Sequence, residues 1–593
     1  MLRPAVIFAA FAAFAAAVPS QAAGHNVLIV IADDLGVDQV GAYQEGTNPA
    51  PTPTIDALAN RGILFRNAWS NPTCSPTRTS INTGRYTFRH KVGDWIMYAN
   101  NGNRTGTLRA RETTIPEALD RAGSGYAHAA FGKWHMNTIQ EGPTYPTTVG
   151  RWGTYFGSMG GLASYYSWER IVNGAPTWTG TYATTQQVND ALAWIQAQTT
   201  PWVCYLAFDA PHTPHHAPPA NLHSRNLTGL NPNGSFAEQR EFYKAMIEAM
   251  DRELGRLFAS LGPTVMADTN VIFLADNGTP LGLAEAPFLP TQGKTTPYEG
   301  GINVPIIIAG PAVQGAPREE TRLVSVVDVF ATTLDLAGAS GGVPSYVEVD
   351  GKSLVPYLQS NSSPTLHDTV FADRYRGDDW PDPIADMSGF GMAMIRNDRF
   401  KLISRNTGTD ELYDLSTDPF ETSNLLLGTL TPLQTQNYSA LTAAMVELRT
   451  APRRVFPYGS NACVGTTGTP QLRISGVPRI GSSYSPVLLG GAPGRLCLLG
   501  SGFSELSYSG YPLPFDLAIL GAGPGCLLQH SIDALSSTIT SALGTASVAI
   551  PIPNAASLLD LPLYHSFVIQ DPGAPGNALG LVTSPAVAVR IGS

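Results

Sequence analysis

The hydrophobic pattern of the first 300 residues alternates between apolar runs and amphipathic stretches. Residues 26–32 (NVLIVIA), 202–208 (WVCYLAF) and 270–275 (NVIFLA) are almost continuously apolar, which is typical of strands buried on both faces of a sheet. Residues 184–198 and 241–261 repeat their apolar positions at helical spacing. This alternation predicts an α/β domain with a largely parallel sheet.

Shorter stretches extend the same pattern. We expect helices in residues 52–65 (TPTIDALANRGILF) and 113–123, and strands in 126–135 (YAHAAFGKWH) and 304–311. From about residue 365 the pattern changes, because residues 393–415 predict antiparallel strands joined by Asn-Asp and Asn-Thr-Gly turns. A closing helix is expected over residues 441–450, and together these elements form a smaller α+β lobe.

The composition changes again after Arg454. Residues 456–593 contain no lysine, four arginines and five acidic residues, and short apolar runs alternate with Gly- and Pro-rich turns. This pattern favours a β-sandwich, and a disordered tail is the alternative. The predicted organisation is a signal peptide (1–22), a catalytic α/β domain (23–364), the smaller lobe (365–455) and a C-terminal β module (456–593).

The first residues indicate export. Arg3 is followed by an apolar run from Ala5 to Val18 and then by small residues at Ser20 and Ala22, which is the pattern of a cleaved secretory signal. A membrane anchor is the alternative, but the run is short for a span. We therefore expect a protein without a membrane span that is secreted, periplasmic or held at the cell surface.

Charge and cysteine content narrow the choice of partners. Charged residues make up 14% of the chain, its formal net charge is −10, and it has no basic tract, so we expect no nucleic acid partner. The five cysteines are an odd number, which leaves at least one thiol outside internal disulfides in an exported protein. Cys204 lies in an apolar run and is expected to be a buried thiol. Among Cys463, Cys497 and Cys526 three pairings are open, and we favour Cys463 with Cys526.

Two acidic clusters follow predicted strands. Asp33 and Asp34 come after the first strand, and Asp276 and Asn277 come after the strand that ends at Ala275. Ligand-binding residues gather at the carboxyl ends of strands in such sheets. Oxygen-only donors suit Ca²⁺ or Mg²⁺ better than zinc. Taken singly, each cluster could also be a solvated loop or an Asn-Gly turn.

Lysine and histidine follow two other strands. Lys133 and His135 are two residues apart, so in a strand both would face one side, where they could bind an anion and move a proton. His212 lies between Pro211 and Pro214, which restrict the loop. The neighbouring His215 and His216 invite a zinc interpretation, which lacks nearby cysteine or carboxylate ligands.

Cys74 lies in residues 74–78 (CSPTR), followed by 83–85 (TGR). This segment resembles the sulfatase signature, whose cysteine is oxidised to formylglycine, an aldehyde. The neighbouring motifs follow in the family's order, with IVIADDLG before the segment and GKWH, APHTP, DNG and GK…YEGG after it. The resemblance covers roughly residues 25–450 and implies an alkaline-phosphatase-like fold with a large, mostly parallel mixed sheet flanked by helices.

The resemblance also implies roles for individual residues. Asp33, Asp34, Asp276, Asn277 and the modified Cys74 would bind one calcium ion. Arg78 would hold the formylglycine, Lys133 and Lys294 would bind sulfate oxygens, His135 would orient or deprotonate the aldehyde hydrate, and His212 would protonate the leaving alcohol. Asn303 stands where the family commonly has arginine, Thr77 replaces a commoner serine, and no residue is assigned to the family's further active-site serine.

In this family one hydroxyl of the hydrated aldehyde attacks sulfur, and loss of the proton on the other expels sulfate. The implied function is a secreted calcium-dependent sulfatase, matured by a formylglycine-generating enzyme and acting on an aryl or glycan sulfate. The alternatives are a formylglycine-dependent phosphodiesterase or phosphonate hydrolase, and a catalytically silent glycan-binding protein. Residues 140–180 and 279–296 are interpreted as loops that line the substrate pocket.

Overall fold

The structure is a computed structural model. It describes residues 24–591 except 99–105, 345–346, 377–390, 407, 451–454, 459–462, 477, 506, 525, 556–557 and 559–560. The predicted signal peptide therefore lies outside the described residues. Among the described residues, no helix combines the length and the apolar character needed to cross a membrane.

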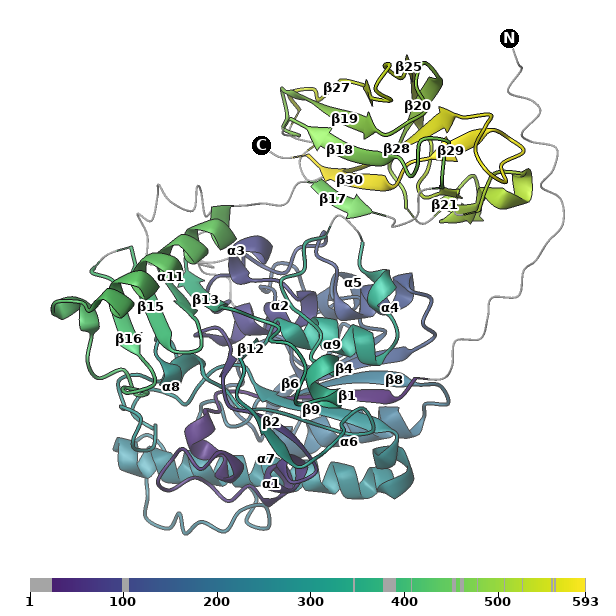
Figure 1. Cartoon of the computed structure of the whole chain (residues 1–593). Coiled ribbons are helices and arrows are strands. Elements are labelled where there is room, and N and C mark those ends of the chain that lie inside the picture. Colours follow the sequence, from purple (N-terminus) through teal and green to yellow (C-terminus); the bar gives the residue numbers. More distant parts are fainter. Residues whose placement is uncertain are drawn as a thin grey trace.

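A ten-stranded mixed sheet forms the centre of the large domain (Figure 1). Its five central strands, in the order β9-β1-β8-β4-β5, are mutually parallel, and antiparallel strands extend it on both sides. In sheet order the strands are β11 (Arg318–Glu320), β2 (Gly62–Phe65), β10 (Ile306–Ala309), β9 (Thr269–Ala275), β1 (Asn26–Ala32), β8 (Trp202–Ala207), β4 (Ala127–Lys133), β5 (Thr154–Ser158), β6 (Trp168–Val172) and β7 (Ala175–Thr179).

Helices cover both faces of this sheet, which explains the continuous apolar runs of its central strands. All residues of β1, β8 and β9 are buried. One face carries α2 (Cys74–Thr83), α4 (Ile115–Arg121) and α9 (Asp328–Leu336), and the other carries α1 (Pro53–Ala59), α6 (Ala183–Gln196) and α7 (Phe236–Ala267) (Figure 1). The predicted fold class, a large mostly parallel mixed sheet flanked by helices, is confirmed.

Three local predictions are wrong in detail. The helix expected over residues 52–65 ends at Ala59, and its last four residues form β2 instead. The strand expected over residues 126–135 ends at Lys133. Residues 140–180, interpreted as a loop, contain β5 and the β6–β7 hairpin. Their outward-facing polar residues hid these strands, since β7 is largely exposed.

The smaller lobe is a four-stranded antiparallel sheet covered by one helix. The strands run in the order β13 (Val370–Tyr375), β14 (Gly391–Arg396), β15 (Phe400–Arg405) and β16 (Glu411–Asp414). The helix α11 (Pro432–Thr450) begins well before the predicted residue 441. Thr431 and Gln434 explain the earlier start, because each accepts a hydrogen bond from the backbone N–H of the other.

The C-terminal module contains two antiparallel sheets that share a core. The larger follows the order β17 (Val455–Tyr458), β30 (Ala586–Arg590), β28 (Pro562–Gln570), β20 (Leu496–Gly502) and β25 (Ala534–Ile539), and the smaller joins β18 (Gln471–Ser475), β19 (Ser483–Leu489) and β26 (Ala546–Ser547). Leu488 of the smaller sheet packs with Leu499 and Phe567 of the larger, so the two sheets form the expected sandwich.

A disulfide joins Cys463 to Cys526, as favoured from the sequence. Cys497 is a buried free thiol in the same core, and Cys204 is a buried thiol on β8. The sandwich contacts the large domain through Arg121 of α4, whose guanidinium lies 2.8 Å from the carboxylate of Glu505.

We predict that truncation after Arg454 leaves turnover of an aryl sulfate, the activity that the sequence resemblance implies, nearly intact. Every candidate catalytic residue lies before residue 300, and the interaction of Arg121 with Glu505 is an ion pair that does not involve those residues. Thermal unfolding would first establish that the truncated chain is folded, and its kcat/KM would then be compared with that of the full chain. A large loss of kcat/KM in a folded truncate would show that the module completes the active site.

Candidate active site

Three groups of polar residues meet at the carboxyl edge of the parallel strands. Asp33 and Asp34 follow β1, Asp276 and Asn277 follow β9, and Lys133 is the last residue of β4. Because β1 pairs in parallel with both β8 and β9, and β4 pairs in parallel with β8, these strands end at the same edge. The site therefore lies where open α/β sheets usually bind ligands.

Cys74 is the first residue of α2, not part of a turn. All ten residues of this helix are buried although most are polar. The hydroxyls of Thr79 and Thr83 donate to carbonyls four residues earlier in the helix, which satisfies them without solvent. Pro76 lies in the first turn, where a helix residue has no N–H bond to lose. The motif thus encodes a buried helix start.

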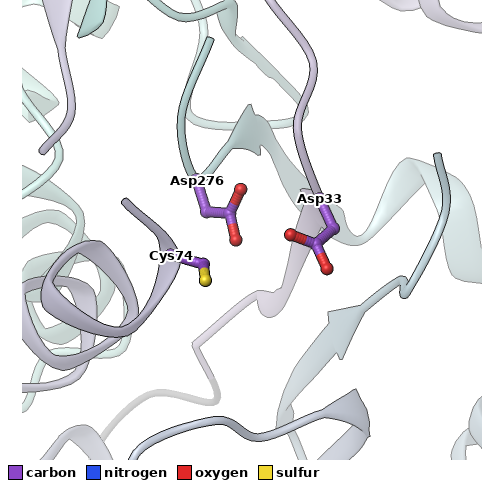
Figure 2. A group of neighbouring side chains, drawn as sticks. All are labelled: Asp33, Cys74 and Asp276. Carbon is purple, nitrogen blue, oxygen red and sulfur yellow. The ribbon is translucent and has the colours of Figure 1, made fainter. Parts of the chain in front are cut away.

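Asp33, Cys74 and Asp276 point toward one another (Figure 2). One ligand atom from each lies within 4.8 Å of those of the other two, and Asp33, Asp34 and His212 satisfy the same limit. Asn277 joins the group, because its amide donates to Asp34 Oδ1 at 2.8 Å. The structure brings together every residue that the resemblance implied as a calcium ligand.

Three cations neutralise these carboxylates. Lys133 Nζ lies 2.5 Å from Asp33 Oδ2, and Lys294 Nζ lies 2.6 Å from Asp34 Oδ1. Arg78 donates through Nε and Nη2 to Asp276 Oδ2, at 3.0 and 2.8 Å, and through Nη1 to the carbonyl of Lys133. Its hydrogen bonds within the described chain thus go to Asp276 and the β4 backbone rather than to Cys74.

The pKa values of the buried carboxyl groups of Asp33 and Asp276 shift in opposite directions. Burial raises the pKa of Asp33, but Lys133 and other cations more than offset this effect and hold the pKa well below its ordinary value. Burial and the charge of Asp33 raise the pKa of Asp276 well above its ordinary value. A metal cation between the two would remove this conflict.

Two buried oxygen atoms fit such a cation. Asp33 Oδ1 and Asn277 Oδ1 accept no hydrogen bond from any described residue, although both side chains are fully buried. Unpaired buried acceptors are costly unless an ion or water satisfies them. With carboxylate oxygens of Asp34 and Asp276 close by, the donor set is all oxygen apart from Cys74, which suits a hard divalent cation.

His135 contacts Cys74 directly, with Nδ1 3.2 Å from Sγ. Its Nε2 lies 2.6 Å from the carbonyl of Ile96, which only accepts, so Nε2 carries the proton and Nδ1 is the acceptor. Burial lowers the pKa of His135 well below its ordinary value, and Lys133 adds to this effect. The prediction that it shares a strand face with Lys133 is wrong, because His135 lies past the strand end with φ of 58°.

His212 lies at the outer side of the site, with Nε2 3.8 Å from Asp34 Oδ2 and Nδ1 2.8 Å from the carbonyl of Thr213. Burial and the two lysines lower its pKa to about 4. His216 turns away to Tyr182, and His215 joins no cluster of three ligand groups among the described residues. Among the described residues, His215 and His216 therefore do not form the ligand set that a zinc site needs.

Sequence reasoning missed Ser158 and Asp209. Ser158 ends β5 directly beside Lys133, and its hydroxyl donates to both carboxylate oxygens of Asp209, at 3.0 and 2.9 Å. Gln187 also donates to this carboxylate, and burial raises the pKa of Asp209 to about 7. Ser158 is thus a buried serine in register with Lys133. Only recognition of β5 as a strand parallel to β4 could have found it.

Asn303 replaces the expected arginine without leaving a gap. It pairs with Trp69 in a β-bridge, and its amide donates to the carbonyl of Arg66. The guanidinium of Arg396 from β14 lies 3.5 Å from Glu299 of the YEGG segment. Asn303 therefore has backbone and side-chain partners at the point where the sequence departs from the family pattern.

The chain is similar to several known sulfatases. It is 30% identical to human N-acetylgalactosamine-6-sulfatase over 362 residues, which are 56% of this chain and 65% of that protein. Mouse arylsulfatase J is 26% identical over 414 residues, which are 65% of this chain and 64% of that protein. Matches of this kind thus span about two thirds of the length of these relatives.

A solved structure of Ps i-CgsB in complex with k-i-k-neocarrahexaose superimposes with a TM-score of 0.59 at 25% identity. The superposition covers 71% of this chain and 93% of that one. The family model for N-sulphoglucosamine sulphohydrolase, C-terminal, matches residues 292–450, which include the smaller lobe. The sulfatase model matches residues 25–339, more than half of the chain and all of the site. The chain therefore belongs to the sulfatase family.

Proposed function

We propose that this protein is an exported, calcium-dependent sulfatase that hydrolyses an aryl or carbohydrate sulfate ester with a formylglycine made from Cys74 by a maturation enzyme. The observation that carries this proposal is the buried cluster in which Cys74, three carboxylates and three cations meet at one edge of the sheet. Family membership and the sulfated substrates named for several relatives support the substrate class.

Lys133 and Lys294 supply the positive charge that a sulfate group requires. Lys133 lies on Asp33, which is clustered with Cys74, and Lys294 lies on the adjacent Asp34, so both are placed to reach the oxygens of a group bound there. Fixed cations in a buried site stabilise charge that develops on sulfuryl oxygens during displacement. Arg78, held by Asp276, adds to this field and orients that carboxylate.

Two histidines would move protons. His135 Nδ1 lies 3.2 Å from Cys74 Sγ, so it can take a proton from a hydroxyl on the modified residue 74. His212 faces the accessible side, where the alcohol would leave, and 23% of its side chain is exposed. Its low pKa keeps it neutral in the free protein. The negative charge of a bound sulfate ester would raise that pKa and allow His212 to act as an acid.

Asp33, Asp34, Asp276, Asn277 and the modified residue 74 would hold the calcium ion. When bound, calcium supplies Lewis acidity that lowers the pKa of an oxygen nucleophile and draws charge from a sulfate oxygen. The chain's own contribution is to bury and orient the oxygen donors. The two unpaired oxygens, Asp33 Oδ1 and Asn277 Oδ1, are the atoms that such an ion would satisfy.

The first alternative function is hydrolysis of a phosphate diester or a phosphonate ester by the same site chemistry. The second is glycan binding without catalysis. The complete set of paired cations and the His135–Cys74 contact favour catalysis. The similarity to sulfatases acting on named sulfate esters favours sulfur over phosphorus.

We predict that the matured protein hydrolyses an aryl sulfate faster than an aryl phosphate diester and that Cys74→Ala abolishes both activities. Peptide mass spectrometry on the active sample should show the aldehyde at residue 74, and the buried Cys204 should remain a thiol as an internal control. Faster turnover of the diester would favour the phosphodiesterase alternative. Full activity with an unmodified Cys74 would refute the formylglycine mechanism.

We predict that a chelator abolishes turnover and lowers the free energy of unfolding, and that calcium restores both better than zinc does. At a calcium concentration 100-fold above Kd the stabilisation should be about 2.7 kcal/mol. The Asp33→Asn variant should lose this calcium-dependent shift in thermal unfolding. Asp190→Asn, which alters an ion pair with Arg170 outside the site, should keep it. An equal shift in both variants would place the ion elsewhere.

We predict that Lys294→Ala lowers kcat/KM for an aryl sulfate by about 100-fold, because loss of one fixed donor to a developing charge typically costs roughly 3 kcal/mol. Steady-state kinetics would measure this effect. The matched control is Lys352→Ala, a change at an exposed lysine whose ammonium group donates to the carbonyl of Leu366. A similar loss in both variants would argue against a specific role for Lys294.

A further inference from the structure

Lys294 lies on a loop that no sheet ladder holds. The loop runs from the end of β9 to α8 (Glu299–Ile302) and contains no strand. Near Lys294 it is anchored by the N–H of Lys294 to the carbonyl of Thr279, at 2.7 Å, and by the N–H of Thr295 to the carbonyl of Pro72. Thr295 adopts a left-handed backbone with φ of 76°, which costs free energy for a residue with a branched side chain. Something else must therefore hold this conformation.

The smaller lobe contacts the loop on both sides of Lys294. On the early side, Phe288 packs edge-on against Phe420 with ring centres 5.2 Å apart, and Gln292 donates to the carbonyl of Glu421 at 3.1 Å. On the later side, the carboxylate of Glu421 accepts a hydrogen bond from the N–H of Glu299 at 2.5 Å. Glu421 thus contacts the loop at Gln292, two residues before Lys294, and at Glu299, five residues after it.

Lys401 of β15 stabilises the contact between Glu421 and the loop through ion pairs. Its ammonium group lies 3.0 Å from Glu299 Oε1 and 2.7 Å from Glu421 Oε1, and its side chain is fully buried. The ring of Trp69 lies beneath the ammonium at 4.9 Å, and the indole N–H of Trp69 donates to Glu299. Without Lys401, Glu421 would lose this ammonium group and face the carboxylate of Glu299, whose remaining cation is Arg396 at 3.5 Å. The two carboxylates would then be expected to separate or take up a proton.

We propose that Lys401, with Glu299 and Glu421, is a positioning cluster through which the smaller lobe holds Lys294 in the active site. None of the described contacts of these three side chains involves Cys74, so we infer that Lys401 acts through the loop. The inference rests on the proposed role of Lys294. The smaller lobe becomes part of the catalytic apparatus, because it completes a loop that the large sheet leaves unsupported.

A double-mutant cycle in the full-length, matured protein tests the coupling. Lys401→Met should lower kcat/KM for an aryl sulfate by about 10-fold or more. In the Lys294→Ala background the same change should have little further effect, because the residue it positions is gone. Lys401→Arg keeps the charge and should recover part of the loss. Arg399→Ala, on the same hairpin, removes an exposed guanidinium that pairs with Asp414 outside this cluster; it is the matched control and should behave like the wild type.

Multiplicative losses in the double variant would overturn the proposal, because Lys401 would then act independently of Lys294. If Lys401→Met does not fold, Glu421→Gln keeps the side-chain shape and the carbonyl that Gln292 contacts, and the same non-additivity is expected. A crystal structure of either variant separates this idea from the proposed function. If the Lys294–Asp34 contact is retained in the variant, the positioning cluster is ruled out whatever the activity. If the wild-type protein shows no turnover, only the proposed function is ruled out.

Discussion

Burial of three carboxylates together with three cations is the constraint on which the catalytic domain depends. Asp33, Asp34 and Asp276 are almost fully buried, and each has a cationic partner within 2.8 Å. An isolated buried charge costs several kcal/mol, and removal of one partner from a buried pair typically costs about 3–5 kcal/mol. The sheet edge is therefore stable only if each of these carboxylates lies beside its cation. The same condition brings the site residues together.

The backbone meets this requirement with strained and closely packed positions. Asp34 and His135 both adopt left-handed conformations, with φ of 71° and 58°, just past the ends of β1 and β4. Gly132 precedes Lys133 with φ of 87°, and a Cβ there would lie 1.9 Å from the carbonyl of Ala207. Such conformations persist only where the surroundings determine them. Here the surroundings are the paired charges, so strain and electrostatics support one another.

This arrangement explains what the sequence could predict. Strands buried on both faces are visible as apolar runs, and polar residues that follow them must share an edge, so the acidic cluster and Lys133 could be placed. Ser158 could not be placed from the sequence, because β5 alternates between buried and partly exposed residues and its sequence resembles that of a loop. Nor could the contacts of Arg78, since helix position alone does not reveal that Asp276 lies beside it. Pairings between distant segments, such as Lys401 with Glu299, leave no local pattern at all.

The three cations differ in how the fold supports them. Arg78 lies on a buried helix and Lys133 ends a strand with neighbours on both sides, so backbone hydrogen bonds fix both. Lys294, by contrast, lies on a loop without strand pairing. A loop residue that must hold a charge within about 3 Å of a carboxylate needs packing from another element. The smaller lobe provides that packing through Glu421 and Lys401. Its sheet thus serves the same purpose for Lys294 that the central sheet serves for Lys133.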